Sequence, residues 1–133
     1  MQTQYQRSHW LDEALAIENA EPSGKLDGDV RADVCIVGGG YTGLWTALRL
    51  KEAEPSIDVV LIEKDLCASG ASGRNAGMLL SFWAKFLSLK KICGESEALR
   101  LAKESDETVA AVIQFCADNN IDADIHLDGW LWV

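Results

Sequence analysis

A glycine-rich turn between two short apolar runs constrains the fold of this chain more than any other feature. Residues 34–37 form a continuous apolar run, which suits a strand buried on both faces of a parallel sheet. The three glycine positions of G-x-G-x-x-G follow and are occupied by Gly38, Gly40 and Gly43. Apolar residues at helical spacing then lead to Pro55, and residues 59–62 supply a second apolar run. This order predicts a strand, a tight turn, a helix and a second strand.

The same stretch is typical of a dinucleotide site. The first glycine permits the tight turn, the second lets a pyrophosphate approach the backbone, and the third lets helix and strand pack closely. The backbone amides at the start of the helix, from Tyr41 through Thr42 to Gly43, would hold a phosphate. Glu63 follows Gly43 by 20 residues, where a carboxylate is expected to accept hydrogen bonds from a ribose. Such a glutamate argues against NADP, whereas FAD and NAD use the same half of this fold.

The segment after Glu63 favours a flavin nucleotide. Residues 68–73 are all small and lead into Arg74 and Asn75, so backbone amides stay accessible beside a guanidinium and an amide. These groups fit pyrophosphate oxygens and the edge of a flavin. No Lys-Ser or Lys-Thr follows the glycines, which excludes a Walker A loop. The structural alternative is a tight turn and a flexible loop without ligand, with Glu63 as a solvated acid.

Three motifs in this order carry a family resemblance. VGGGYTGL, LIEKD and GASGRNAGM resemble the amino-terminal region of FAD-dependent oxidoreductases of the D-amino-acid oxidase superfamily, which includes glycine oxidase and sarcosine oxidase. The lead-in LDGDVRADVCIVGGGYTG is most similar to the branch containing gamma-glutamylputrescine oxidase. The resemblance covers residues 8–133. It implies FAD as cofactor and hydride transfer from the C–N unit of an amine or amino acid to the flavin.

The resemblance also implies roles for matching residues. The three motif glycines would contact the FAD pyrophosphate. Glu63, with Lys64 as a further candidate, would contact the adenosine end. The pyrophosphate and the flavin side would be contacted by Ser72, Arg74 and Asn75. No catalytic residue is assigned, because the substrate pocket is expected beyond Val133.

Patterns in the rest of the chain predict its remaining elements. Helices are expected over residues 83–92 and 96–117 from apolar spacing. Residues 121–127 alternate between apolar and polar, which predicts a strand, and Asp128-Gly129 predicts a hairpin turn into residues 130–133. A chain that ends on an apolar strand without a cap is expected to be a truncated piece.

The expected fold class is therefore α/β. It consists of a Rossmann-like FAD-binding βαβ unit, helices, and the start of an antiparallel hairpin, in an incomplete domain. Residues 1–30 are expected to form an amino-terminal arm with room for a short helix. Residues 31–120 would be the amino-terminal part of the FAD-binding domain, and residues 121–133 the start of a substrate domain.

Composition excludes several other classes. Twelve basic and 21 acidic residues give a net charge of −9, so nucleic acid is a poor partner. No run reaches the length of a membrane span and the first residues form no signal core, which predicts a cytoplasmic location. The four cysteines lack zinc spacing, predicting reduced thiols and no metal site, with Cys67 as buried filler. His9 and His126 are expected to be solvated.

Two other functions stay open at this point. One is an NAD-linked dehydrogenase, which would use the same glycines but would give no role to the GASGRNAG segment. The other is a nucleotide-binding fragment with no activity of its own. In the preferred interpretation the partner is a small-molecule amine or amino acid, and the sequence carries no signal for an oligomeric state.

Overall fold

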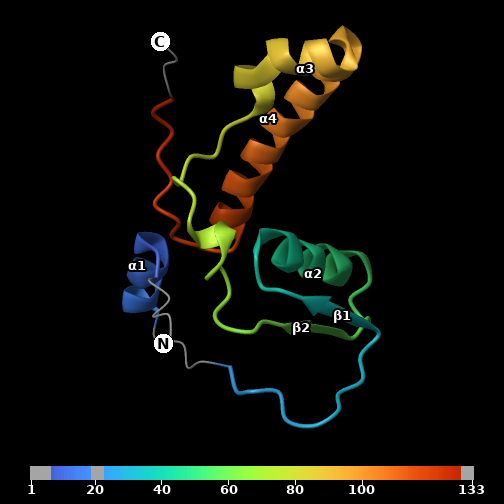
Figure 1. Cartoon of the computed structure of the whole chain (residues 1–133), viewed down its shortest axis with the longest axis vertical. Coiled ribbons are helices and arrows are strands. Elements are labelled where there is room, and N and C mark those ends of the chain that lie inside the picture. Colours follow the sequence, from blue (N-terminus) through green and yellow to red (C-terminus); the bar gives the residue numbers. More distant parts are fainter. Residues whose placement is uncertain (1–6, 19–22, 130–133) are drawn as a thin grey trace, which may run out of the picture. The chain divides into compact units, whose positions relative to one another are not determined.

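The computed structural model describes residues 7–18 and 23–129 (Figure 1). In chain order the elements are α1 (His9–Ile17), β1 (Val34–Val37), α2 (Tyr41–Ala53), β2 (Val59–Ile62), the 3₁₀ turns η1 (Ala71–Gly73) and η2 (Phe82–Lys85), α3 (Phe86–Cys93) and α4 (Glu95–Asp118). The chain divides into two compact units, Met1–Ala76 and Gly77–Val133, and each is described by itself. This division differs from the predicted domains, whose limits stay a prediction.

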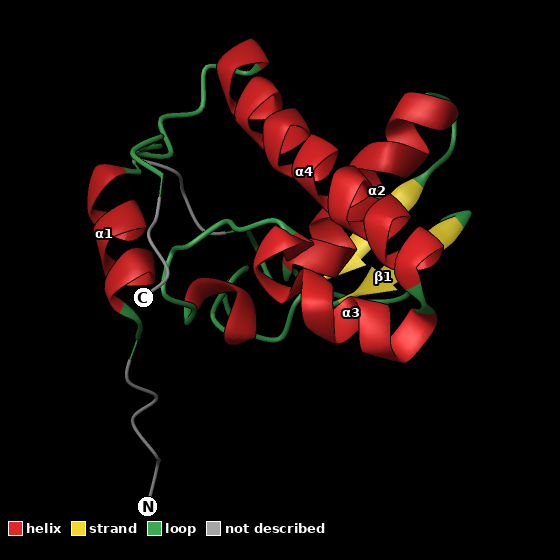
Figure 2. Ribbon diagram, turned by 90° about the horizontal axis from the view of Figure 1, so that it is seen from above, coloured by secondary structure: helices red, strands yellow, loops and turns green. Residues whose placement is uncertain are grey.

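The centre of the first unit is the predicted βαβ arrangement. β1 and β2 pair in parallel, with Val34 opposite Val59 and Val37 opposite Ile62. α2 connects them and lies over one face of the pair, as Figure 1 shows from the side and Figure 2 from above. The strand, helix and strand predicted from the apolar runs and the glycine spacing are therefore confirmed.

The predicted burial of both strand faces is wrong for β1. Along this strand half-buried residues alternate with exposed ones, and Val37 is 80% exposed. Ile36 faces α2, because a Cβ atom on Gly43 would stand 3.3 Å from its Cγ2. Successive side chains of a strand point to opposite faces, so Cys35 and Val37 point away from α2. α2 covers the first face of the pair, and among the described residues the second face stays open at Cys35 and Val37.

The amino-terminal arm carries the short helix for which the sequence leaves room. α1 begins after Ser8, whose Oγ accepts a hydrogen bond from the amide of Leu11 at 3.2 Å. A serine in this position satisfies one of the amides that a helix start leaves without an intrahelical partner. Leu11 is only 8% exposed, and it lines a pocket together with Leu66 and Ser69 of the same unit.

The second unit is helical, as predicted. α4 packs against both α3 and η2, and Gly94 separates the two helices at φ 82°, a conformation that favours glycine. Ala98 and Ala102 are fully buried on α4. The hydroxyl of Ser105 accepts a hydrogen bond from the amide of Phe82 at 2.8 Å, which fixes η2 against α4. The first turn of the shorter predicted helix is 3₁₀ rather than α.

The predicted strand over residues 121–127 is wrong. Residues 121–129 have no regular secondary structure, and Asp124 has a φ of 46°, which a strand does not accommodate. The predicted partner, residues 130–133, lies outside the described residues. A strand requires hydrogen bonds to a neighbour, and no described residue pairs with this segment as a strand. Apolar alternation alone therefore did not produce a strand over residues 121–127.

Candidate dinucleotide-binding site

The turn between β1 and α2 packs backbone against backbone. Gly38 has a φ of 105°, in the region that glycine adopts without strain. A Cβ atom added to Gly43 would stand 2.1 Å from the carbonyl oxygen of Gly38. Only hydrogen fits at Gly43, so the first turn of α2 lies directly against the end of β1. Steric constraints thus explain why glycine occupies the first and third positions of the motif.

The start of α2 keeps backbone donors available. Gly40 is the N-cap residue and makes no side-chain cap bond. The amide of Tyr41 donates to Oγ of Ser72 at 2.9 Å. No described residue accepts from the amides of Thr42 and Gly43. Together with the positive end of the helix dipole, these two donors fit an anionic group such as a phosphate.

The carboxylate of Glu63 lies on the other side of the turn. Its Oε2 accepts from the amide of Gly39 at 2.8 Å, and its Oε1 accepts from the amide of Asp65 at 3.1 Å. These two bonds, the Gly39 bond foremost, lower the pKa of Glu63 below its ordinary value of 4.5. Each carboxylate oxygen keeps a second lone pair, so Glu63 can still accept a hydrogen bond from a sugar hydroxyl.

The lowered pKa of Glu63 predicts a pH dependence of this turn. The folded turn favours the charged form of Glu63. The stability that this carboxylate adds to the folded turn is therefore present above pH 4.5, and it is lost as the pH falls through the lowered pKa. We expect the amide of Gly39 to be protected from hydrogen exchange at neutral pH and to lose that protection in acid. In Glu63→Gln the protection factor, measured by NMR, should be lower and independent of pH.

The matched control is Glu54→Gln. Hydrogen bonds from Ser56 lower the pKa of Glu54, and neither residue contacts the turn. This variant should therefore leave the exchange of the Gly39 amide as it is in the unmodified chain. Equal pH profiles for Gly39 in Glu63→Gln and in the unmodified chain would contradict the assignment of the bond.

The segment formed by residues 67–75 lies against the same turn. The amide of Ala68 donates to the carbonyl of Gly39 at 3.0 Å. Gly39 is buried, and a Cβ atom there would stand 2.4 Å from Sγ of Cys67. A Cβ atom on Gly40 would likewise stand 2.9 Å from Oγ of Ser72. The glycines are therefore needed both for the turn and for the approach of this segment.

Asn75 connects the end of the 67–75 segment to α2. Its Nδ2 donates to the carbonyl oxygen of Ser72 at 2.6 Å and to the hydroxyl of Tyr41 at 3.3 Å. Ser72 in turn accepts from the amide of Tyr41. The structure thus brings these three predicted site residues together at the amino terminus of α2.

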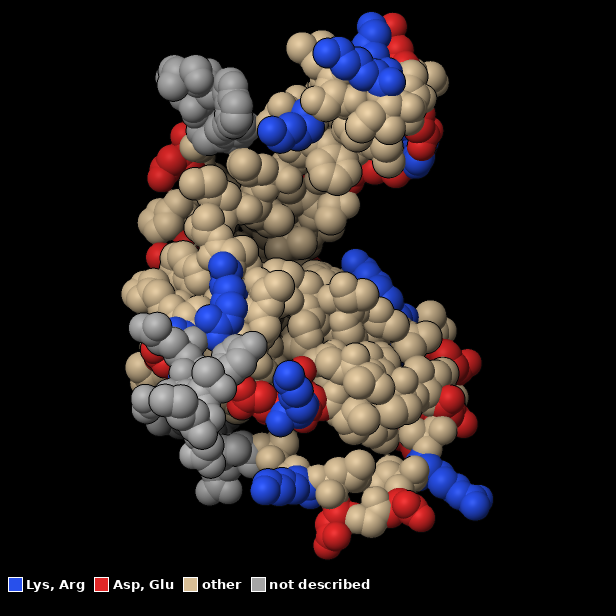
Figure 3. Space-filling view, in the orientation of Figure 1, with Lys and Arg blue, Asp and Glu red and all other residues tan. Residues whose placement is uncertain are grey.

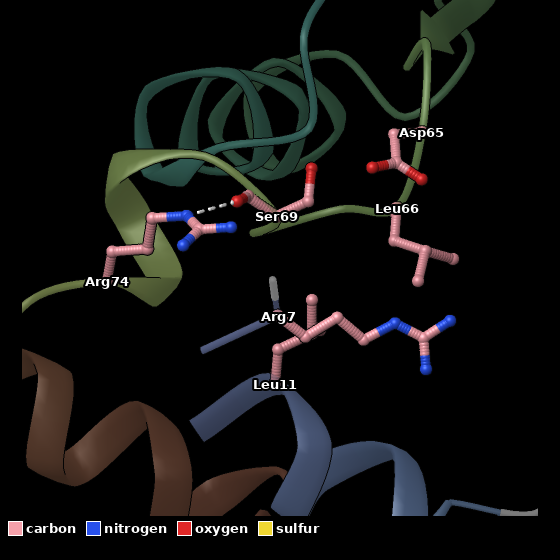
Figure 4. A pocket seen from close by; sticks show the side chains of 6 residues that line it. All are labelled: Arg7, Leu11, Asp65, Leu66, Ser69 and Arg74. Atoms are coloured by element: carbon pink, nitrogen blue, oxygen red, sulfur yellow. Dashed lines mark hydrogen bonds between the residues drawn. The ribbon is translucent and has the colours of Figure 1, made fainter. Parts of the chain in front are cut away.

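The two basic side chains among the predicted site residues are those of Arg74 and Lys64. Nε of Arg74 donates to the carbonyl oxygen of Ser69 at 2.9 Å (Figure 4). The guanidinium borders a pocket of about 180 Å³ that is lined by Arg7, Leu11, Asp65, Leu66, Ser69 and Arg74. Lys64 is exposed, and its charge makes only a minor contribution to the lowered pKa of Glu63.

Three participants were not among the predicted site residues. Gly39 stands between two motif glycines, and its amide and carbonyl join Glu63 to the 67–75 segment. Cys67 is exposed rather than buried filler, although its sulfur occupies the space beside Gly39. Trp10 donates from Nε1 to the carbonyl oxygen of Asn75 at 2.9 Å. The run of three consecutive glycines was a usable signal for Gly39, whereas the Trp10 contact spans 65 residues and has no local pattern.

The remaining candidates for chemistry are exposed or isolated. The side chain of His126 is 69% exposed and contacts Asp124, and His9 lies on α1 beside Trp10. The expected solvation of His126 is confirmed. Cysteines 35, 67, 93 and 116 are free thiols. Within residues 7–18 and 23–129 no group of three or more His, Cys, Asp or Glu side chains could hold a metal ion.

Charge and hydropathy add two observations. Basic side chains are scattered among acidic ones rather than gathered into one patch on the face that Figure 3 shows. Among the described helices, none combines the length and the apolar character that a bilayer crossing needs.

Comparison with known proteins identifies the family. Residues 33–133 match the family described as FAD dependent oxidoreductase. This match covers the glycine turn, Glu63 and the 67–75 segment. The chain belongs to this FAD-dependent oxidoreductase family, which favours FAD over NAD as the nucleotide of the site.

Individual relatives agree with this assignment. The chain is 43% identical over 72 residues to gamma-glutamylputrescine oxidoreductase of Escherichia coli, an alignment of 54% of this chain and 16% of that protein. It is 36% identical over 100 residues to "Probable oxidoreductase OrdL" of Rhizobium meliloti, covering 73% of this chain and 22% of the relative. L-2-hydroxyglutarate dehydrogenase of Indibacter alkaliphilus is 36% identical over 90 residues, covering 66% and 20%.

These alignments cover only 16% to 22% of the length of the three relatives. No solved structure matches the chain significantly. The comparisons therefore define the family of the chain and not the activity of a whole protein.

Proposed function

We propose that the protein is an FAD-dependent oxidoreductase of the amine or amino-acid oxidase type, and that this chain carries the amino-terminal part of its FAD site. One observation carries the proposal. The glycine turn, Glu63 and the 67–75 segment are joined by hydrogen bonds around the start of α2, within a chain of the FAD-dependent family. The donors and the carboxylate fit the phosphate and the ribose of a dinucleotide.

Each residue group would hold a different part of FAD. The amides of Thr42 and Gly43 would donate to the pyrophosphate, which Gly38 and Gly40 allow to come close. Glu63, with Lys64 beside it, would contact the adenosine end. The flavin side and the remaining pyrophosphate oxygens would face Tyr41, Ser72, Arg74 and Asn75. When bound, FAD supplies the acceptor for a hydride from carbon.

We further propose a C–N substrate. The identity to gamma-glutamylputrescine oxidoreductase exceeds that to L-2-hydroxyglutarate dehydrogenase, 43% against 36%. A hydroxy acid is the second candidate, because that dehydrogenase is also a relative. The catalytic residues are not assigned to this chain. The net charge of −9 disfavours nucleic acid as a partner, and a cytoplasmic location stays a prediction from the sequence.

The first experiment identifies the nucleotide. The purified protein is denatured, and any released small molecule is analysed by mass spectrometry. Protein recovered empty is titrated with FAD and with NAD, and the flavin absorption and fluorescence are followed. We expect FAD to be released or to bind in preference to NAD. Release of NAD, or no binding of FAD, would contradict the proposal.

The second experiment separates the substrate classes. The FAD-loaded protein is mixed anaerobically with amines, with amino acids and with 2-hydroxy acids, and loss of the oxidised flavin absorption is recorded. Bleaching by an amine or amino acid is expected. Bleaching by hydroxy acids alone would move the assignment to the second candidate, and bleaching by none would favour a nucleotide-binding fragment without activity.

A further inference from the structure

α1 places two side chains against the 67–75 segment. Ser8 caps the helix through Oγ, and its carbonyl accepts from the amide of Asp12 at 3.0 Å, so the first turn of α1 has a defined geometry. This turn holds Trp10 and Leu11. The indole Nε1 of Trp10 donates to the carbonyl oxygen of Asn75 at 2.9 Å.

Leu11 fixes the same helix by burial. It is one of three buried apolar residues in the described part of the chain, and at 8% exposure it differs from Trp10, which is 44% exposed. Figure 4 shows Leu11 on α1 facing the segment that carries Leu66 and Ser69. Burial of Leu11 therefore holds α1 in place, and the directional hydrogen bond from Trp10 orients α1 against the 67–75 segment.

The residue that Trp10 contacts is the one that organises the start of α2. The carbonyl of Asn75 accepts from Trp10, while its side chain donates to Ser72 and to Tyr41. Ser72 also accepts from the amide of Tyr41. A hydrogen bond at the backbone of Asn75 therefore restricts where its side-chain amide lies, and that amide sets the position of Ser72 relative to the helix start.

We propose that Trp10 is a positioning residue for FAD binding, acting through Asn75 and not by contact with the cofactor. This inference rests on the proposed function. It assigns the amino-terminal arm, which lies outside the matched residues 33–133, a role in the site. A site held ready in the unliganded protein binds more tightly because less ordering is needed on binding.

The test uses Trp10→Phe, which keeps an aromatic ring and removes the N–H donor. The FAD dissociation constant is expected to rise about three- to tenfold, the range of one net hydrogen bond. Thermal unfolding of the protein without FAD should stay nearly unchanged, because Leu11 still anchors α1. Trp83→Phe is the matched control, since Trp83 is also 44% exposed and lies on η2. It should leave FAD binding unchanged.

A second variant separates positioning from general support. Asn75→Ala keeps the carbonyl that accepts from Trp10 but removes the side-chain amide. If Trp10 acts through that amide, adding Trp10→Phe to Asn75→Ala should change the FAD dissociation constant less than twofold. Full additivity of the two effects would overturn the proposal, because independent sites add and coupled ones do not.

The remaining outcomes are also distinguishable. If the unmodified protein binds FAD and Trp10→Phe binds it equally well, the role of Trp10 is overturned while the proposed function stands. If the unmodified protein binds no FAD, the proposed function fails and the positioning role fails with it.

Discussion

Replacing Gly43 with alanine is expected to weaken FAD binding strongly and to open the turn between β1 and α2. The added Cβ atom would lie 2.1 Å from the carbonyl oxygen of Gly38 and 3.3 Å from Cγ2 of Ile36. Because the closest atom belongs to the backbone, no side-chain rotation relieves the overlap. Overpacking of this kind costs about 3 kcal/mol. If FAD binds only the closed turn, its affinity should fall roughly 100-fold.

The measurement combines FAD titration with hydrogen exchange of the amides in β1 and β2. The control is Gly70→Ala, because Gly70 has a φ of −81° and a Cβ atom there would meet nothing within 4 Å. Faster exchange in both strands and a much weaker FAD affinity are expected for Gly43→Ala and not for Gly70→Ala. Equal FAD affinity of the two variants would show that the turn does not need glycine at position 43.

The parts of the fold that could be predicted are those with a local cause. β1, α2 and β2 follow from two apolar runs and a glycine spacing, all within 29 residues from Val34 to Ile62. α4 follows from apolar spacing along 24 residues, and its ends agree with the prediction to within one residue. Within the helices the hydrogen bonds join residues that are close in the sequence, and the two strands are consecutive along the chain and pair with each other.

The predictions that were wrong concern parts of the fold that depend on distant or additional partners. Residues 121–127 have strand periodicity, but periodicity supplies no hydrogen-bond partner, and the structure shows none among the described residues. The predicted burial of both faces of β1 fails for a related reason, since in the described part of the chain no second layer covers Val37. An apolar run indicates that a strand can be buried, but it does not show whether another element covers that strand.

The predictions for the candidate site divide in the same way, into those with a local cause and those that depend on distant residues. The spacing from Gly43 to Glu63 predicts a carboxylate at the turn, and the structure places it there, bonded to the amide of Gly39. The clustering of Ser72 and Asn75 at the start of α2 depends on how the 67–75 segment folds back, which the sequence does not encode by spacing. The hydrogen bond from Trp10 to Asn75 joins residues still further apart in the sequence, and only the structure reveals it.

Gly39→Ala is expected to disturb the site in a way that a second substitution corrects. A Cβ atom at Gly39 would lie 2.4 Å from Sγ and 3.1 Å from Cβ of Cys67. Here the obstacle is mainly a side chain, in contrast to the backbone carbonyl that faces Gly43. We expect Gly39→Ala to destabilise the first unit by about 2 kcal/mol and to weaken FAD binding roughly tenfold.

Adding Cys67→Gly should recover part of both losses, because it removes the two closest atoms and leaves Cα of Cys67, at 3.2 Å, as the next nearest. The four proteins of this double-mutant cycle are compared by urea unfolding and FAD titration. A coupling free energy of about 1 kcal/mol in favour of the double variant is expected. Cys67→Gly alone measures the cost of the new glycine, so that cost cancels in the cycle. Strictly additive effects would mean that the 67–75 segment does not contact the glycine turn at Gly39, and the joined site at the start of α2 would lose its physical basis.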